Sequence, residues 1–214
     1  MRSAIIEAQF LPCLHYMSKL LSYDHIYLEK KEHYKKRTYR NRCRVGSPNG
    51  ILNLSVPLGK GKSSQCPMDE VTVAYQDDWA RKFLRAIQSS YGKSAYFLHY
   101  FPELEDILLS KPTTLFDLNA GLIEWLIESL QMEVKISSTE QYQLPTELAE
   151  DIDDLRDQIQ LKKSTTDSSF EEYPYPQVFE AKTGFLKDLS VIELLFTQGP
   201  QALFHLHNCI KPSN

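Results

Sequence analysis

The side chains best suited to chemistry gather in one short segment, residues 32–44, with the sequence EHYKKRTYRNRCR. Arginine presents a planar set of donors that matches phosphate or carboxylate, tyrosine adds a ring and a hydroxyl, and asparagine both donates and accepts. If the segment is extended, Arg40, Arg42 and Arg44 project from one side and the residues between them from the other. The mixture predicts a site for a phosphorylated or nucleotide-like ligand. Its basic residues are Lys35, Lys36, Arg37, Arg40, Arg42 and Arg44.

The same segment can also be interpreted as a solvated basic strand that pairs with the acidic stretch at 150–157. The formal net charge of −4 excludes a globally basic nucleic-acid binder, but it leaves room for a local basic face. A second phosphate candidate is the glycine-rich loop at 59–64, whose backbone N–H groups could cradle an anion. That loop lacks the glycine and lysine spacing of a P-loop.

Polar side chains elsewhere each carry two interpretations. Glu7, Gln9 and His15 flank the expected end of the first strand, where Glu7 is either a general base or simply exposed. Trp79 either stacks on a base or a sugar ring or belongs to the core. Asn119 lies in an otherwise apolar helix, so its amide either braces a neighbouring loop or faces a site.

These residues need a scaffold, and the hydrophobic pattern predicts an α/β one. Residues 4–10 read as a strand, 14–21 as a helix and 25–28 as a second strand. A crossover helix makes the two strands parallel, so a ligand crevice is expected beyond their carboxyl ends, with residues 30–44 on its rim. The fold class predicted is a single α/β domain with a mixed sheet that begins with this parallel unit and is flanked by helices. Further strands are expected at 51–58, 70–75 and 133–136, and further helices at 79–91, 104–109, 114–132, 190–196 and before Cys209.

Length and composition agree with one soluble globular domain over 1–214, since the chain is 42% apolar and 24% charged. Its acidic and Ser/Thr-rich stretch around 150–170 is expected to be a mobile loop. No apolar run approaches the roughly 18 residues needed to cross a bilayer, and no signal-peptide core is evident, so we expect a cytoplasmic protein. Scattered cysteines and histidines predict no metal site, and no cofactor motif is found.

Longer motifs make the chain similar to the WbqC-like protein family, in a form resembling members from Bacteroidetes. The resemblance runs nearly end to end. It rests on FLPCLHYMSK at 10–19, YKKRTYRNRCR at 34–44, NG at 49–50 before LSVP at 54–57, Trp79 with Ala86, Ile87 and Tyr91, LN at 118–119, DLR at 154–156, YPQVF at 175–179, GF at 184–185 and LSVIELLF at 189–196 before GP at 199–200.

The resemblance implies a transferase of cell-surface polysaccharide (O-antigen type) biosynthesis, with aminoacyl (glycine) or acyl transfer to an activated sugar. It implies that the stretch 39–42 lines the site, and our leading hypothesis is that Arg40 and Arg42 hold the phosphates while Tyr39 or Asn41 orients the acceptor. The alternative is a non-catalytic module that binds a nucleotide sugar or an RNA such as a tRNA acceptor arm. Expected partners are therefore an activated sugar or another phosphorylated small molecule, with nucleic acid second. The full set of predicted substrate-binding residues is Tyr34, Lys36, Tyr39, Arg40, Asn41, Arg42, Trp79 and Asn119.

The chain departs from the family pattern at its N-terminus and in the helix after the tryptophan. Many members resemble H-Q-P-x-Y-L-P-W, whereas residues 6–8 here are Ile, Glu and Ala, and Cys13 replaces the tryptophan. A histidine expected later is Phe83. If either histidine is the family's general base, this chain binds substrate without that base. If the chemistry depends on the basic segment, the site is intact.

Overall fold

A four-stranded parallel sheet forms one half of the molecule. The computed structural model describes residues 2–59, 65–161 and 167–211. The sheet has the strand order β5-β2-β1-β6, and all neighbours run parallel. Its strands are β1 (Ser3–Glu7), β2 (His25–Glu29), β5 (Lys135–Ser138) and β6 (Ile152–Asp154).

The predicted strand, helix and strand at the N-terminus are confirmed. Helix α1 (Leu14–Leu20) connects β1 to β2, and the register places Glu7 opposite Glu29, so both strands end side by side on a glutamate. Because β1 and β2 run parallel, their carboxyl ends lie at the same edge of the sheet. The segment that follows β2 therefore begins at this carboxyl edge. Residues 30–41 thus lie on the rim, whereas residues 42–44 of the predicted rim, 30–44, belong to strand β3 (Arg42–Ser47) of a hairpin.

Strand β6 lies within the stretch that the sequence assigned to an acidic loop. It pairs with the edge of β1, and Leu155, directly after it, is buried. The carboxylates of this stretch do not prevent strand formation because arginines neutralise them: Asp153 pairs with Arg2 and Asp154 with Arg156. Residues 162–166 of the expected mobile loop lie outside the described part of the chain.

A β-hairpin and several helices form the other half. The hairpin joins β3 (Arg42–Ser47) to β4 (Gly50–Ser55), with Gly50 at a φ of 98° in the turn, a conformation that favours glycine. The helices are α2 (Trp79–Tyr91), α3 (Phe97–Leu109), α4 (Leu115–Ser129), α5 (Glu180–Thr183), α6 (Val191–Gln198) and α7 (Ala202–Asn208). Short 3₁₀ turns are η1 (Met68–Glu70), η2 (Pro145–Glu147) and η3 (Gly199–Gln201).

Two local expectations differ from the structure. The strand expected at 70–75 is the turn η1 followed by single bridges, from Thr72 to Thr114 and from Val73 to Leu58. The apolar residues there, Val71 and Val73, are buried without a regular partner strand. Helix α3 begins at Phe97, upstream of the predicted start at 104.

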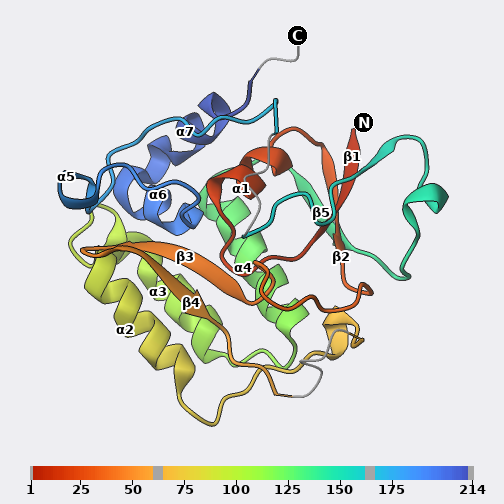
Figure 1. Ribbon diagram of the computed structural model, residues 1–214, viewed down its shortest axis with the longest axis horizontal. Helices are drawn as coiled ribbons and strands as arrows, with labels where there is room; N and C mark the ends of the chain where they lie inside the picture. The colour runs from red at the N-terminus through yellow and green to blue at the C-terminus, as the bar shows by residue number, and fades with distance from the viewer. Residues whose placement is uncertain (1, 60–64, 162–166, 212–214) are drawn as a thin grey trace.

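The two faces of the parallel sheet are covered differently. Figure 1 shows helices on one side and the segment 139–151 looping out on the other. Toward the helices the strands present small and aliphatic residues that are fully buried, such as Ala4, Ile6 and Ile26. Toward segment 139–151 they present Ile5, Tyr27 and Ile152. The second face is the one that leaves room for a ligand.

Among the helices of the described ranges, none combines the length and the apolar character that a membrane span requires.

Candidate functional site

Charged side chains converge at the carboxyl ends of the parallel strands. Strands β1, β2 and β6 end on Glu7, Glu29 and Asp154. The segments that follow β2 and β6 bring in Arg40 and Arg156. The carboxyl edge of a parallel sheet is where α/β proteins bind their ligands, so topology and chemistry indicate the same place.

Arg40 is the centre of one buried network. Its Nε and Nη2 lie 2.7 and 2.6 Å from the two carboxylate oxygens of Glu32, and Nη2 also lies 3.0 Å from Asp157 Oδ1. Asp157 in turn contacts Lys35, and its backbone N–H donates to Glu7 Oε2 at 2.9 Å. The arginine thus ties the rim segment to the loop after β6.

Arg156 is the centre of a second network. Its Nε and Nη2 donate to the two oxygens of Asp154 at 2.9 and 2.7 Å, and Nη1 lies 3.2 Å from Glu29 Oε2. Nη1 also donates to the backbone oxygen of Gln143 at 2.9 Å, while the Tyr142 ring lies 4.9 Å from the guanidinium carbon. The stacked arginine therefore fixes segment 141–143 against the sheet edge.

A pocket of about 280 Å³ opens between these networks. We call it the charged pocket. Positive charge comes from Lys31, Lys35 and Arg156, and negative charge from Glu32 and Asp157. Lys31 Nζ lies 2.5 Å from Asp69, outside the pocket wall. The lining residues are Lys31, Glu32, His33, Lys35, Tyr142, Arg156 and Asp157.

The carboxylates around Arg40 have displaced pKa values. Burial raises the pKa of Glu32 to about 7, even though its contact with Arg40 acts in the opposite direction. Burial also raises the pKa of Glu7. Burial alone would raise the pKa of Asp157, but Lys35 and Arg40 outweigh it and hold the value below the usual one. Neighbouring carboxyl groups with pKa values pushed apart are a frequent property of catalytic sites.

Asn119 on α4 holds two backbone segments of this site together through hydrogen bonds. Its Nδ2 on α4 donates to the backbone oxygen of Ala8 at 2.9 Å and to that of Arg40 at 2.7 Å. The side chain is fully buried. Of the two roles open to Asn119, the geometry shows the bracing one: the amide joins the end of β1 to the basic segment.

The basic segment is more buried than an extended solvated strand would be. Tyr34 donates to Asn41 Oδ1 at 3.1 Å, and Asn41 Nδ2 donates to the backbone of Val56 at 3.0 Å. Arg40 is only 2% exposed, whereas Lys36 is exposed. Lys35 and Arg40 both pair with Asp157, which agrees with the alternative interpretation that the basic segment pairs with the acidic stretch at 150–157. Whether the predicted residues touch a ligand stays a prediction.

Arg42 and Trp79 each leave a buried N–H without a protein partner. Within the residues that the structure describes, neither Arg42 Nε nor Trp79 Nε1 finds a hydrogen-bond acceptor. Trp79 packs among Phe10, Tyr75 and Phe83 in the core, with its ring 6.4 Å from that of Phe10. Trp79 is therefore surrounded by core side chains, as expected if it belongs to the core.

Tyr39 and His15 line a different pocket, of about 340 Å³, together with Glu172 and Asp188. His15 Nε2 lies 2.9 Å from Asp167, and burial lowers the pKa of His15. Burial raises the pKa of Glu172 to about 7, and its Oε1 has no partner among the described residues. Of the eight predicted substrate-binding residues, only Tyr39 is among those that line this pocket, and none is among those that line the charged pocket. Arg40 reaches the charged pocket only through its contacts with Glu32 and Asp157. The glycine-rich loop at 59–64 cannot be placed in either, because residues 60–64 lie outside the described ranges.

Several residues of the charged pocket were not selected from the sequence. Glu32, Lys31 and His33 belong to the predicted rim, and the rule that ligands lie beyond strand ends could have selected them. Tyr142 and Arg156 reach the pocket only through β6, which the sequence did not predict. For Tyr142 and Arg156, the one sequence signal was the motif DLR at 154–156, which contains Arg156.

The positions at which the chain departs from the family pattern are all buried. Ile6 and Phe83 are core residues, and burial raises the pKa of the Cys13 thiol to about 12. Ile6, Cys13 and Phe83 therefore supply no proton donor or acceptor near neutral pH, whereas the buried carboxyl group of Glu7 lies between Ile6 and Ala8 in the departing stretch. Over 2–59, 65–161 and 167–211, no three His, Cys, Asp or Glu side chains are grouped so as to hold a metal ion.

Comparison with known proteins supports the resemblance. The model of the WbqC-like protein family matches residues 8–169. The chain is 24% identical over 227 aligned residues to Rv1507c of Mycobacterium tuberculosis (strain ATCC 25618 / H37Rv), described as an uncharacterized protein, with 96% of this chain and 97% of the relative covered. No solved structure matches. The chain belongs to the WbqC-like protein family.

Proposed function

We propose that the protein is a transferase of cell-surface polysaccharide biosynthesis that binds an activated sugar in the charged pocket. The supporting observation is that Lys31, Lys35 and the buried Glu32 line one pocket, at the carboxyl edge of a parallel sheet. The family resemblance supports the sugar substrate and the transfer reaction. The geometry supports the location.

The two lysines are suited to hold the phosphates of the activated sugar. Their side chains are 38% and 51% exposed, and each ammonium group is paired with one carboxylate, Asp69 or Asp157, that a phosphate can replace. Arg156 is only 6% exposed and fully engaged, so it shapes the wall rather than moving to a phosphate. Charge-assisted hydrogen bonds to phosphate are among the stronger polar contacts, and lysine provides them as a mobile point charge.

Glu32 is the group we assign to proton transfer. It lines the pocket, and a pKa raised to about 7 by burial places it in the range where a carboxylate can act as a general base. In acyl or aminoacyl transfer, a hydroxyl or amine of the sugar attacks the acyl carbon and gives its proton to Glu32. The bond to the acyl carrier then breaks, and the carrier leaves with the electron pair.

In this proposal Arg40 is a positioning residue. Its guanidinium holds Glu32 in a bidentate contact, which fixes both the direction of the carboxylate and its distance from the lysines. Tyr34 and Asn41 keep the same segment folded. The binding roles predicted for Lys36, Tyr39 and Arg42 remain a proposal beside this one.

Calorimetry with a panel of UDP-, GDP- and CMP-linked sugars tests the proposal. At least one compound should bind wild-type protein in a saturable manner, and Lys31→Gln/Lys35→Gln should weaken that binding by about tenfold or more, the loss of one or two charge-assisted contacts. The matched control is Lys93→Gln/Lys182→Gln, which removes the same charge from exposed positions outside the pocket. Equal losses in both double variants, or no binding by wild type, would contradict it.

The second candidate, a nucleic-acid-binding module, is favoured by one observation. Lys35, Lys36 and Arg37 are consecutive and exposed beside the pocket. Binding through several phosphates weakens steeply with salt, whereas a small ligand in a pocket shows a shallow dependence. Titration of a tRNA at several salt concentrations separates the two: a steep slope that Lys36→Gln/Arg37→Gln reduces would favour the module.

A further inference from the structure

A second cavity lies on the open face of the parallel sheet, next to the charged pocket. Its volume is about 430 Å³, within the range of small-molecule sites. We call it the sheet-face pocket. Its lining residues come from β1, β2, β5 and β6 and from the segment after β5: Ile5, Tyr27, Ser138, Thr139, Glu140, Gln141, Gln143, Leu148 and Ile152.

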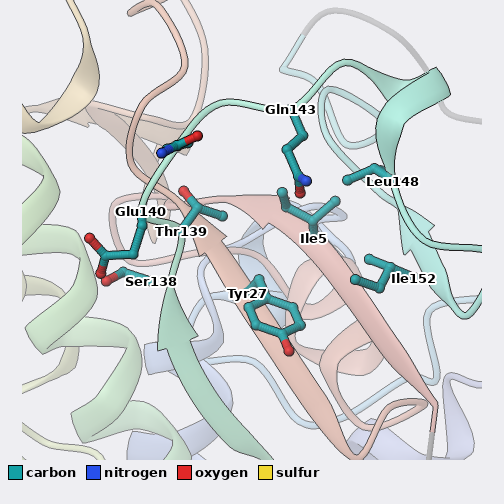
Figure 2. Close-up of a pocket in the computed structure, with 9 residues that line it drawn as sticks. Ile5, Tyr27, Ser138, Thr139, Glu140, Gln143, Leu148 and Ile152 are labelled. Atoms are coloured by element: carbon teal, nitrogen blue, oxygen red, sulfur yellow. The ribbon is translucent and has the colours of Figure 1, made fainter.

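The floor of the sheet-face pocket is apolar and its rim is polar but mostly uncharged. Figure 2 shows Ile5, Ile152 and Leu148 facing one another, the Tyr27 ring on the neighbouring strand, and the Gln143 amide directed toward Ile5. Ile5 is opposite Tyr27 in the strand register, so both lie on the same face. Such a surface favours a ligand with a flat apolar face and many hydroxyl groups.

The rim groups are free to bind. Over the described part of the chain, the side chains of Ser138, Gln141 and Gln143 have no hydrogen bond to protein. Amide and hydroxyl groups both donate and accept, as sugar hydroxyls require. Thr139, by contrast, already donates to Glu29, and among the described residues that line the pocket Glu140 alone is charged. A phosphate has no cationic partner among these lining residues.

The two pockets share one stretch of backbone. Gln141 and Gln143 line the sheet-face pocket, and Tyr142 between them lines the charged pocket. Arg156, which also lines the charged pocket, holds the Gln143 backbone oxygen at 2.9 Å. The two pockets are therefore neighbours across segment 141–143, as the sites for a phosphorylated end and a neutral polyhydroxylated end of one ligand would be.

We propose that the sheet-face pocket is the subsite for the sugar ring of the activated sugar, with its apolar face on Ile5 and Tyr27 and its hydroxyls on Gln141 and Gln143. This inference rests on the proposed function, because the charged pocket must hold the phosphates. It adds the location of sugar specificity: the ring is selected on the sheet face, not by the basic segment at 34–44.

The test uses three ligands for each sugar of the panel: the nucleotide sugar, the free nucleotide and the free sugar. Gln141→Ala/Gln143→Ala should weaken binding of the nucleotide sugar by about tenfold and leave binding of the free nucleotide unchanged. Tyr27→Leu should have the same selectivity, and its thermal unfolding is measured alongside because Tyr27 lies in the sheet. Thr146→Ala in the same exposed segment, outside both linings, is the matched control.

The outcomes separate the subsite from the proposed function. If wild type binds nucleotide sugars, and Gln141→Ala/Gln143→Ala leaves that binding unchanged or weakens nucleotide and nucleotide sugar equally, the subsite is wrong while the proposed function stands. If only free sugars bind, and the double variant removes that binding, the pocket is a sugar site and the proposed function is wrong. If none of the three ligand types binds, both are overturned.

Discussion

Arg40 and Glu32 form a bidentate ion pair with both side chains almost fully buried, the guanidinium Nε and Nη2 lying 2.7 and 2.6 Å from the two carboxylate oxygens. The pair joins two points of the rim segment that are eight residues apart, and Asp157 closes the network from the loop after β6. A buried ion pair contributes little net stability, but removing one partner leaves the other charged and unsolvated. The network therefore fixes the geometry of the charged pocket.

Removing the guanidinium should be costly. Arg40→Met leaves Glu32 and Asp157 without their shared cation, so we expect the free energy of unfolding to fall by about 3–5 kcal/mol. Urea denaturation measures this fall. Arg37→Met is the control, since Arg37 is exposed and its loss should change stability by less than about 0.5 kcal/mol. Similar, small effects of the two substitutions would show that the network does not hold the rim.

Glu32→Gln should separate binding from chemistry. The amide keeps the shape of the side chain, so affinity for the nucleotide sugar should stay near the wild-type value while turnover falls by about 10²-fold or more. The wild-type rate should rise with pH through about 7, the raised pKa of Glu32, and the variant should lack that step. Turnover and its pH profile are measured on the same preparation. Retention of wild-type turnover would remove Glu32 from the mechanism.

Asn119→Ala tests the brace between β1 and the basic segment. The substitution leaves the buried carbonyl oxygens of Ala8 and Arg40 without a donor, so we expect a loss of about 2–4 kcal/mol in the free energy of unfolding. Asn53→Ala, at an exposed position on β4, should change it little. Urea denaturation of both variants decides. A mild effect of Asn119→Ala would mean that water or a shifted backbone replaces the amide.

Glu193 should make stability depend on pH. It is buried near the start of α6, it accepts hydrogen bonds from the Val178 N–H at 3.0 Å and the Tyr91 hydroxyl at 3.2 Å, and burial raises its pKa to about 7. Between the unfolded value near 4.5 and about 7, the folded state binds more protons than the unfolded state. The stability from this group is therefore complete below pH 4.5 and is lost as pH rises through 7, by roughly 3 kcal/mol in total.

Unfolding by urea at pH 5 and pH 8 measures this dependence. Wild type should be less stable at pH 8 by an amount that Glu193→Gln reduces, because the amide does not ionise. Glu180→Gln, at an exposed position on α5, should retain the wild-type dependence. If the free energy of unfolding changed equally between pH 5 and pH 8 in all three proteins, the pH dependence would come from a group other than Glu193.

The parallel start of the fold could be predicted from sequence because its signals are local. Residues 4–28 alternate and then repeat at helical spacing, and a crossover helix determines the strand direction. Strand β6 could not be predicted in this way, since Ile152, Asp153 and Asp154 carry no strand pattern. It forms because β1 offers a free edge and because Arg2 and Arg156, distant in sequence, neutralise its carboxylates.

The sequence predicted where the candidate site lies better than it predicted which residues line it. The rim after β2 follows from topology, and Arg40 lies there as expected. The contact of Arg40 with Asp157 corresponds to the alternative in which the basic segment pairs with the acidic stretch at 150–157, but the burial of Arg40 and its bidentate contact with Glu32 depend on tertiary packing. The sequence leaves two interpretations open for Trp79 and for Asn119. The structure places the Trp79 ring among core aromatic side chains and the Asn119 amide between two backbone oxygens. The Tyr142 ring packs against the Arg156 guanidinium, but the two residues are far apart in the sequence, so their spacing does not predict this contact.

Mapping the ligand by NMR tests most directly whether the charged pocket binds an activated sugar. Backbone amide signals are followed while a nucleotide sugar that binds in the calorimetric panel is added. We expect the signals of Lys31, Glu32, Lys35 and Arg156 to shift together, with a saturable dependence on ligand concentration. Shifts confined to the other polar pocket, around His15, Tyr39 and Glu172, would contradict it.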